Sequence, residues 1–114
     1  RYNSLIQGYE YHDQSGDLAE ELLRGYGIED IERILIKDDI NMIREVLDRA
    51  IKSGAHMIIF IGGTGVSDSD VTIEALKPLF KKELTSFNTL FTMYSEAEVG
   101  SRAISSRATA GIID

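Results

Sequence analysis

A run of glycines followed by acidic residues is the part of this sequence best suited to chemistry. Gly62–Gly65 reads Gly-Gly-Thr-Gly directly after five apolar residues, and Asp68 and Asp70 follow it. Glycines let backbone N–H groups approach an anion without a Cβ in the way. Carboxylates bind Mg²⁺ together with water and substrate phosphates. The stretch therefore predicts a site for a phosphorylated ligand, with a simple tight turn as the alternative.

A third carboxylate, Asp38, is expected at the same place. It follows residues 31–36, an apolar segment that predicts a short strand, and precedes Asp39, the natural N-cap of the next helix. Because the carboxyl ends of parallel strands lie at one edge of a sheet, Asp38 should approach Asp68 and Asp70. Such a site favours phosphoryl or nucleotidyl transfer, which depends on positioning and charge neutralisation. A solvated loop aspartate is the alternative for Asp38.

The composition excludes several other classes of protein. The chain has 114 residues, of which 43% are hydrophobic, enough for one globular domain, and it has no apolar run of membrane-spanning length. Its net charge of −7 argues against a general surface for nucleic acid or an anionic membrane. Without cysteine there is no thiolate nucleophile, and a cytoplasmic protein is the default. His12 and His56 show neither metal-ligand spacing nor a serine–histidine–aspartate arrangement.

Helical periodicity and capping residues predict the elements that position these side chains. Residues 13–17 supply helix-start chemistry for an apolar face that ends near Gly25 and Gly27. The N–H groups at that start are suited to an anion, although ordinary capping is the simpler interpretation. A continuous apolar stripe predicts a second helix over 40–51, ended by Gly54.

The second half of the chain predicts further helices. Thr72 is expected to cap a helix over 73–77, which Pro78 should kink or restart. Apolar residues at helical spacing continue over 87–94. Ser95–Glu98 fits a capping box, which predicts that a separate helix begins there.

Three segments predict strands, and their alternation with helices predicts the fold class. Residues 57–61 are expected to form a strand buried on both faces, 31–36 a shorter strand, and 109–113 a third, in which Gly111 allows close approach of a neighbouring backbone. Strands that alternate with helices join through right-handed crossovers into a parallel sheet. The expected fold is α/β, a doubly wound, mostly parallel sheet with helices on both faces, with residues 1–114 as a single domain.

Several of these motifs together resemble a known family. The resemblance runs from about Tyr11 to the last residue. It is to the molybdopterin-binding family of molybdenum-cofactor biosynthesis, which includes the MoaB and Mog proteins and the gephyrin G domain. The motifs that carry it are Asp13-x-Ser15-Gly16, Lys37-Asp38-Asp39, Gly62-Gly63-Thr64-Gly65, Asp70-Val71-Thr72 with Glu74-Ala75, Ser106-Arg107-Ala108 and Ala110-Gly111.

The resemblance implies a function. Enzymatic members of the family activate molybdopterin by adenylylation, in which the terminal phosphate of the pterin attacks the α-phosphate of Mg-ATP and pyrophosphate leaves. The implied ligands are therefore molybdopterin, ATP and Mg²⁺. The family also implies the molybdopterin-binding fold and a homotrimer, or a hexamer built from trimers.

The same resemblance implies roles for individual residues. Asp38 and Asp70 would be the catalytic aspartates and would hold the metal. Asp13, Ser15 and Gly16 would line the nucleotide side. The remaining ligand-binding set, which would hold the pterin and its phosphate, is Gly62, Gly63, Thr64, Gly65, Thr72 and Ser106.

Two functions of different kinds stay open at this point. One is a molybdopterin adenylyltransferase, and the other is a non-catalytic molybdopterin-binding or assembly protein of the same family. A competence-damage-inducible type of protein, which shares a glycine loop followed by Asp-x-x-Thr, is a third alternative. The family's opening strand would precede Arg1 and its proline- and glycine-rich closing segment would follow Asp114, so we expect a domain truncated at both ends. The sequence leaves molybdenum and tungsten equally open as the eventual metal.

Overall fold

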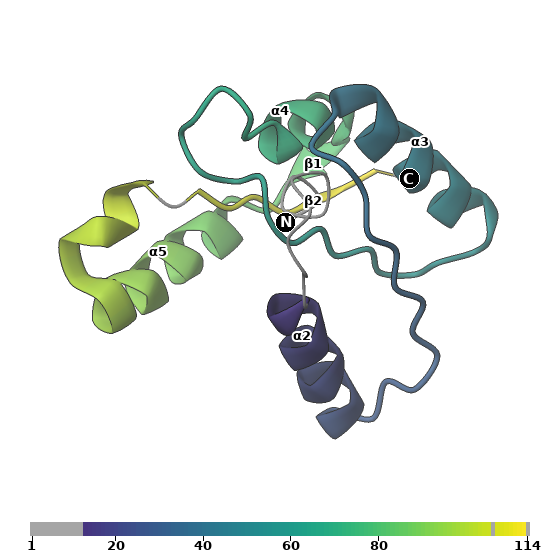
Figure 1. The fold of residues 1–114 in the computed structure, drawn as a ribbon, viewed down its shortest axis with the longest axis horizontal. Helices are drawn as coiled ribbons and strands as arrows, with labels where there is room; N and C mark the ends of the chain where they lie inside the picture. The colour runs from purple at the N-terminus through teal and green to yellow at the C-terminus, as the bar shows by residue number, and fades with distance from the viewer. Residues whose placement is uncertain (1–12, 106, 114) are drawn as a thin grey trace, which may run out of the picture. The chain divides into compact units, whose positions relative to one another are not determined.

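The computed structural model describes residues 13–105 and 107–113 (Figure 1). The chain divides into two units, residues 1–37 and residues 38–114. The described elements are, in chain order, α2 (Gln14–Gly25), α3 (Ile40–Lys52), α4 (Thr72–Leu76), the 3-10 helix η1 (Lys77–Leu79), β1 (Lys82–Glu83), α5 (Thr85–Val99), the 3-10 helix η2 (Gly100–Ser105) and β2 (Gly111–Ile112).

Helix α2 of the first unit begins and ends where the sequence predicts. Asp13 is its N-cap, and the Asp13 carboxylate accepts a hydrogen bond from the Gly16 N–H at 3.0 Å. The helix ends at Gly25, and Gly27 follows with φ +88°. A positive φ just after a helix is the conformation that glycine adopts at little cost. The capping interpretation of residues 13–17 is therefore confirmed.

The core of the second unit lies between α3 and α4. Asp39 caps α3, since its carboxylate accepts from the Met42 N–H at 2.9 Å, as predicted. The apolar stripe of α3 then brings one face of the helix into the interior. The buried apolar residues of the described chain come only from these two helices, and they are Ile43, Val46, Leu47, Ala75 and Leu76.

The helices after α4 follow the prediction in part. Pro78 lies in η1, directly after α4, so the predicted restart at the proline is confirmed. The N-cap of α4 is Val71, and Thr72 is the first helical residue, so the prediction of Thr72 as the cap is wrong. The predicted helix start at Ser95 is also wrong, because α5 runs without a break from Thr85 to Val99. A capping box needs unpaired N–H groups, and a residue inside a continuous helix has none to offer.

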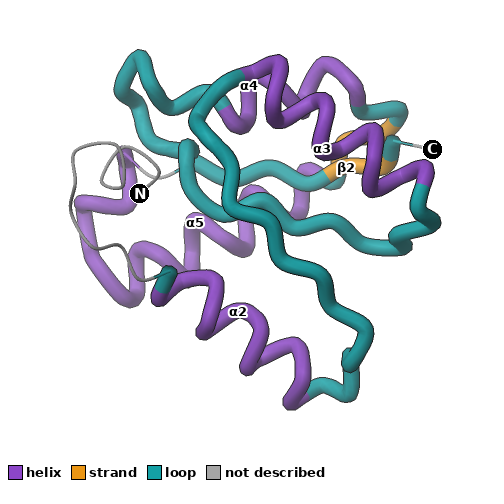
Figure 2. Tube along the Cα trace, turned by 45° about the vertical axis from the view of Figure 1, so that its right-hand side comes forward, coloured by secondary structure: helices purple, strands orange, loops and turns teal. Residues whose placement is uncertain are grey.

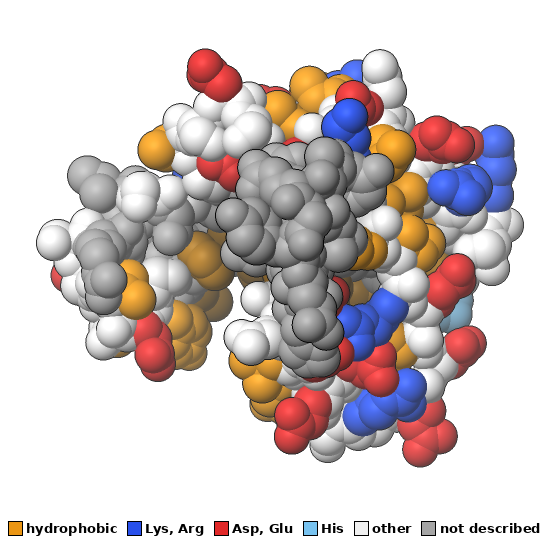
Figure 3. Space-filling view, viewed as in Figure 1, with side chains coloured by type: hydrophobic (Ala, Val, Ile, Leu, Met, Phe, Trp, Pro, Cys, Tyr) orange, Lys and Arg blue, Asp and Glu red, His pale blue; other side chains and the backbone are white. Residues whose placement is uncertain are grey.

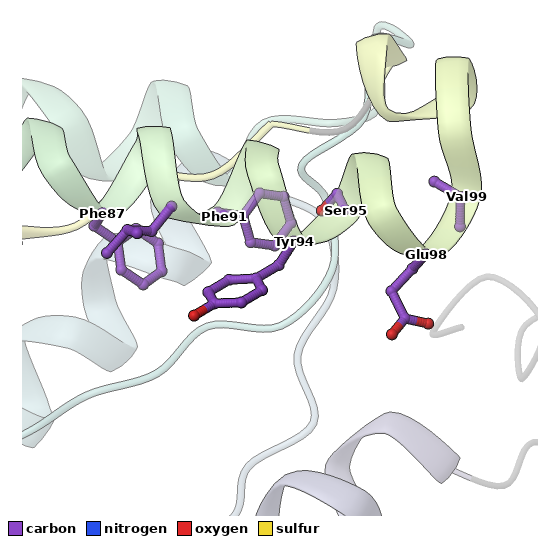
Figure 4. Close-up of a pocket in the computed structure, with 7 residues that line it drawn as sticks. Phe87, Phe91, Tyr94, Ser95, Glu98 and Val99 are labelled. Carbon is purple, nitrogen blue, oxygen red and sulfur yellow. The ribbon is translucent and has the colours of Figure 1, made fainter.

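Helix α5 presents apolar side chains to the exterior. The rings of Phe87 and Phe91 stack with their centroids 6.4 Å apart, and Tyr94 continues the same face (Figure 4). An open groove of about 490 Å³ runs along this face. Hydrophobic side chains are visible over α5 in the space-filling view (Figure 3). The helical spacing predicted for 87–94 is confirmed, but the face is exposed rather than buried.

The predicted strands at 31–36 and 57–61 are not strands in the described part of the chain. Both segments run as loops (Figure 2), without ladder hydrogen bonds to any described residue. Met57, Ile59 and Ile61 are 52–57% exposed, so the segment is not buried on both faces. A strand requires a hydrogen-bonded neighbour, and apolar composition alone does not supply one. The doubly wound sheet therefore stays a prediction.

The described sheet consists of β1 and β2. The two strands pair antiparallel, with Lys82 opposite Ile112 and Glu83 opposite Gly111. Part of the strand predicted at 109–113 is therefore present as β2, and its described neighbour, β1, is a strand that the sequence did not predict. A Cβ on Gly111 would collide with the ring of Phe80. Close approach at this glycine is therefore confirmed, although a side chain rather than a backbone makes it.

Across the described residues, no helix combines the length and the apolar character needed to cross a membrane.

The α3–α4 core makes a prediction about stability. Replacing Ile43, which is 2% exposed, by alanine should lower the free energy of unfolding by about 2–4 kcal/mol, the loss typical of a buried aliphatic side chain. Met42→Ala, one position earlier and 37% exposed, is the matched control and should cost less than about 1 kcal/mol. Urea titration of both variants measures the difference. Equal losses would show that α3 does not pack as described.

Candidate functional site

Thr72 holds the first half of the glycine loop. Its hydroxyl donates to the Gly62 carbonyl at 2.9 Å, and its backbone N–H donates to the Gly63 carbonyl at 3.0 Å. Thr72 is 6% exposed, the one buried polar residue among those described. Gly62 and Gly63 have φ of +99° and +66°, a region that favours glycine. Because Thr72 does not cap α4, its hydroxyl is used to fix the loop.

Arg107 holds the second half of the loop. Its Nε donates to the Thr64 carbonyl at 3.1 Å and to the Gly65 carbonyl at 2.8 Å. Each of the four carbonyl groups from Gly62 to Gly65 is thus bound by either Thr72 or Arg107. The loop is cross-linked both to α4 and to the segment that leads into β2.

The N–H groups of the same loop are available to a ligand. Among residues 13–105 and 107–113, those of Gly62, Gly63 and Thr64 have no hydrogen-bond partner. Successive backbone N–H groups in a glycine-rich turn are a donor set that binds phosphate in many proteins. The loop therefore has its four carbonyl acceptors occupied and the N–H donors of Gly62, Gly63 and Thr64 open, as an anion site requires, while the Gly65 N–H binds Asp70.

Asp38 lies beside this loop. A Cβ built on Gly63 would collide with the Thr72 hydroxyl and would lie 3.2 Å from Asp38 Oδ1. The side chain of Asp38 is itself exposed. The structure thus brings Asp38 to Gly63, as expected for a residue at a neighbouring segment end, and its role in binding or catalysis stays a prediction.

Asp70 lies at the other end of the loop, in a turn with Ser67. Asp70 Oδ2 accepts from the Ser67 hydroxyl at 2.7 Å and from the Ser67 N–H at 3.1 Å. These two bonds are the main reason that the pKa of Asp70 lies below its usual value. The Gly65 N–H and the positive charge of Arg107 lower this pKa further, while desolvation opposes them. Asp70 is therefore an ionised acceptor at neutral pH, suited to charge neutralisation rather than to proton abstraction.

Glu74 and Arg107 form an ion pair next to Asp70. Arg107 Nη1 lies 2.5 Å from Glu74 Oε2, and Nη2 lies 3.2 Å from Oε1, a bidentate arrangement. Hydrogen bonding to Arg107 lowers the pKa of Glu74, so the pair is charged at neutral pH. The pair borders an open pocket of about 360 Å³ that is lined by Val66, Ser67, Asp68, Asp70, Val71, Glu74 and Arg107.

Sequence reasoning assigned no role to Arg107 or Glu74. Both belong to the motifs that carry the family resemblance, Ser106-Arg107-Ala108 and Glu74-Ala75. The signal was therefore present as a motif. What was missing was the contact, because two residues 33 positions apart show no local pattern.

The nucleotide-side residues of the prediction lie in the first unit. The carboxylate of Asp13 caps α2 and also pairs with Arg33, whose Nη2 lies 3.0 Å from Asp13 Oδ2. Arg33 Nη1 lies 2.7 Å from Asp17 Oδ1. Acidic and basic side chains lie side by side over α2 in Figure 3. A Cβ on Gly16 would collide with Asp13 Oδ2 and lie 2.5 Å from Arg33 Nη2, so a larger residue here would have to displace the ends of this ion pair.

The structure says little about the roles of two further predicted site residues. Ser15 is exposed near the start of α2. Ser106, assigned to the pterin phosphate, lies outside the described residues.

Comparison with known proteins identifies the family of the chain. Residues 3–113 match the family model described as a probable molybdopterin binding domain. The chain belongs to this family. Its relatives include a probable molybdopterin adenylyltransferase of Methanocaldococcus jannaschii, 41% identical over 113 residues, with 98% of this chain and 66% of the relative covered.

A second relative and a solved structure agree with this membership. A molybdopterin adenylyltransferase of Pyrococcus furiosus is 45% identical over 104 residues, covering 91% of this chain and 60% of the relative. The crystal structure of the tungsten cofactor synthesizing protein MoaB from Pyrococcus furiosus has a TM-score of 0.83 at 42% identity, covering 92% of this chain and 64% of that one. The chain thus spans under two thirds of the length of these relatives, and its structure is consistent with the molybdopterin-binding fold.

The carboxylates at the glycine loop fit Mg²⁺ better than a metal held by protein alone. Among the described residues, no group of three or more His, Cys, Asp or Glu side chains is arranged to hold a metal ion. Asp38 and Asp70 instead flank the loop, at Gly63 and Gly65. Mg²⁺ is commonly bound by one or two carboxylates, with water and substrate phosphates completing the shell. Two carboxylates beside a loop with open N–H donors fit an ion that arrives with a phosphorylated ligand.

The close packing at Gly63 makes a prediction. Gly63→Ala should destabilise the protein by about 1–2 kcal/mol through its positive φ and by about 1–3 kcal/mol more through overpacking against Thr72 and Asp38. Gly54→Ala is the matched control, because Gly54 has φ +87° but no described atom within 4 Å of a Cβ. Thermal unfolding of both variants isolates the second contribution. Equal destabilisation would mean that the loop is not packed against Thr72.

The hydrogen bonds to Asp70 predict a pH effect. A carboxylate with a lowered folded-state pKa stabilises the protein above the unfolded-state pKa, and this contribution is lost as pH falls through the folded-state pKa. For Asp70 the loss begins near its usual value of 3.8 and continues below it. Ser67→Ala should raise the pKa of Asp70 more than Arg107→Gln does, since the Ser67 hydroxyl is the larger cause. Carboxyl carbon NMR titration of Asp70 in the three proteins measures this order, and the reverse order would contradict it.

Proposed function

We propose that this chain binds molybdopterin through the glycine loop and adenylylates it with Mg-ATP, releasing pyrophosphate. The reaction prepares the pterin for metal insertion in molybdenum-cofactor biosynthesis. The names of the two adenylyltransferase relatives support this activity, and membership of the molybdopterin-binding family supports the ligand.

One observation carries the proposal. The four carbonyl groups of Gly62–Gly65 are bound by Thr72 and Arg107, and the N–H groups of Gly62, Gly63 and Thr64 have no partner among the described residues. An anion is the ligand that such a loop favours, because three of its N–H donors are open and its four carbonyl acceptors are occupied. The ligand implied by the family, molybdopterin, carries such an anion in its terminal phosphate.

The proposed step is a substitution at phosphorus. An oxygen of the pterin phosphate forms a bond to the α-phosphorus of ATP, and the bond from that phosphorus to the oxygen bridging to the β-phosphate breaks. Pyrophosphate leaves with both electrons of the broken bond. No covalent enzyme intermediate is needed, so the residues of the chain act by positioning and charge neutralisation. The lowered pKa of Asp70 suits it to this role.

Several residues complete the proposed site. Asp38 and Asp70 would hold Mg²⁺, which when bound neutralises charge on the transferring phosphates. Thr72 holds the loop, and Ser106 is proposed for the pterin phosphate. The nucleotide is assigned to a separate set in the first unit, Asp13, Ser15 and Gly16.

The proposal also covers the domain, the oligomeric state and the location of the protein. Residues 1–114 represent one molybdopterin-binding domain, with the doubly wound, mostly parallel sheet of that fold. The protein is a homotrimer or a hexamer, with no nucleic-acid or membrane partner. It acts in the cytoplasm, where the absence of cysteine raises no conflict with reducing conditions.

Pyrophosphate release from ATP in the presence of molybdopterin tests the proposal. Asp70→Asn and Asp38→Asn should each lower kcat by about 100-fold or more, the loss typical when one preorganised electrostatic group is removed. Asp48→Asn is the matched control. It removes the same charge from an exposed residue of α3 that pairs with Lys52 at 2.8 Å, and it should keep full activity.

Two outcomes would overturn parts of the proposal. Full activity in Asp70→Asn and Asp38→Asn would remove the assigned catalytic roles. Tight molybdopterin binding without any pyrophosphate release would replace the enzyme by a non-catalytic pterin-binding or assembly protein. Isothermal titration with ATP, with and without molybdopterin, separates that second outcome from a failure to bind the pterin.

A further inference from the structure

Arg107 joins three separate parts of the described chain around the glycine loop. Its Nε binds the carbonyls of Thr64 and Gly65, and its Nη2 lies 3.5 Å from the carbonyl of Asp70. Both of its Nη atoms bind Glu74 on α4. One guanidinium therefore ties the glycine loop, the turn that carries Asp70 and a helix together.

The charge of Arg107 is used inside the protein. The Arg107 side chain is 33% exposed, and its bidentate partner Glu74 is 47% exposed, so the pair borders the pocket. A guanidinium has five N–H donors in a fixed planar fork, which lets one side chain bind carbonyls and a carboxylate at the same time. A lysine ammonium in the same place lacks this fork.

We propose that Arg107 is a positioning residue, which holds the Thr64–Gly65 half of the loop and the Asp70 turn in the geometry for the pterin phosphate, and that Glu74 orients it. This role rests on the proposed function for its ligand. The competing role for Arg107 is direct binding of the phosphate. The two roles predict opposite effects of Glu74. If Arg107 positions the loop, Glu74 helps it by fixing the guanidinium. If Arg107 binds the phosphate directly, Glu74 competes with the phosphate for the same guanidinium.

The first experiment needs no ligand. Amide hydrogen exchange is measured in the full chain at Ser67 and Asp70, whose N–H groups are bonded within the turn. Arg107→Gln should speed exchange there by about 10-fold or more through local opening, without a matching increase at Ile43 in α3. Arg44→Gln is the matched control, since Arg44 Nε also binds a carbonyl of α4, that of Ala75 at 3.0 Å, but does not contact the loop.

The second experiment separates the two roles by the direction in which the KM for molybdopterin changes. Glu74→Gln should raise the KM for molybdopterin by about 10-fold, the effect of losing one charge-assisted hydrogen bond, and leave the KM for ATP unchanged. Arg107→Lys should recover part of the loss seen in Arg107→Gln. The double variant Arg107→Gln/Glu74→Gln should be no worse than Arg107→Gln alone, because Glu74 acts through Arg107.

The outcomes that overturn the proposal are distinct from failure of the proposed function. Tighter molybdopterin binding in Glu74→Gln, or unchanged exchange at Ser67 and Asp70 in Arg107→Gln, would overturn the positioning role. A lower kcat with both KM values unchanged would show a loss of transition-state stabilisation or of folded protein rather than of positioning for the pterin phosphate, and would also overturn it. If the wild-type chain binds no molybdopterin, the proposed function fails, while the exchange experiment still decides whether Arg107 holds the loop.

Discussion

The glycine loop depends on hydrogen bonds from residues that are far from it in the sequence. Glycine loses more conformational freedom on ordering than any other residue, so a loop with three glycines is costly to hold in one shape. Thr72 and Arg107 offset that cost with four bonds to successive carbonyls. A typical hydrogen bond contributes about 1 kcal/mol net. Because Thr72 and Arg107 each bind two of the four carbonyls, losing either residue leaves half of the loop without these bonds. The same four bonds occupy carbonyls only, so the N–H groups of Gly62, Gly63 and Thr64 stay open in a loop of fixed shape.

Local sequence signals predicted α2 and α3 well. The cap at Asp39 and the cap at Asp13 were predictable because a side chain that accepts from an N–H three positions later is a local contact. The apolar stripe of α3 predicted its buried face for the same reason, since helical periodicity is visible in one short window. The approach of Asp38 to Gly63 was also predicted, although by a sheet that the described residues do not form. This prediction needed only that the ends of residues 31–36 and 57–61 lie close together, whether or not the two segments form strands.

Most of the failures share one physical cause, which is a contact made over a long range, whereas the failed helix start at Ser95 is local. Residues 57–61 have the composition of a buried strand, but a strand exists only where another backbone pairs with it. Thr72 is a residue type that commonly caps helices, but its hydroxyl donates to the Gly62 carbonyl, ten positions away. Arg107 shows nothing locally of its contacts with Thr64 and Glu74. Such contacts are set by the fold as a whole, so motif resemblance indicates which residues matter without indicating what they touch.

The position of the core explains why the site is built on α4. The buried apolar residues of the described chain lie on α3 and α4, whereas the apolar face of α5 is exposed (Figure 4). Ala75 and Leu76 anchor α4, and the same five-residue helix carries Thr72 and Glu74, the residues that hold the loop and orient Arg107. A helix this short is not stable alone, so its packing against α3 is what fixes those two side chains. The stability of the core and the geometry of the glycine loop are therefore coupled through α4.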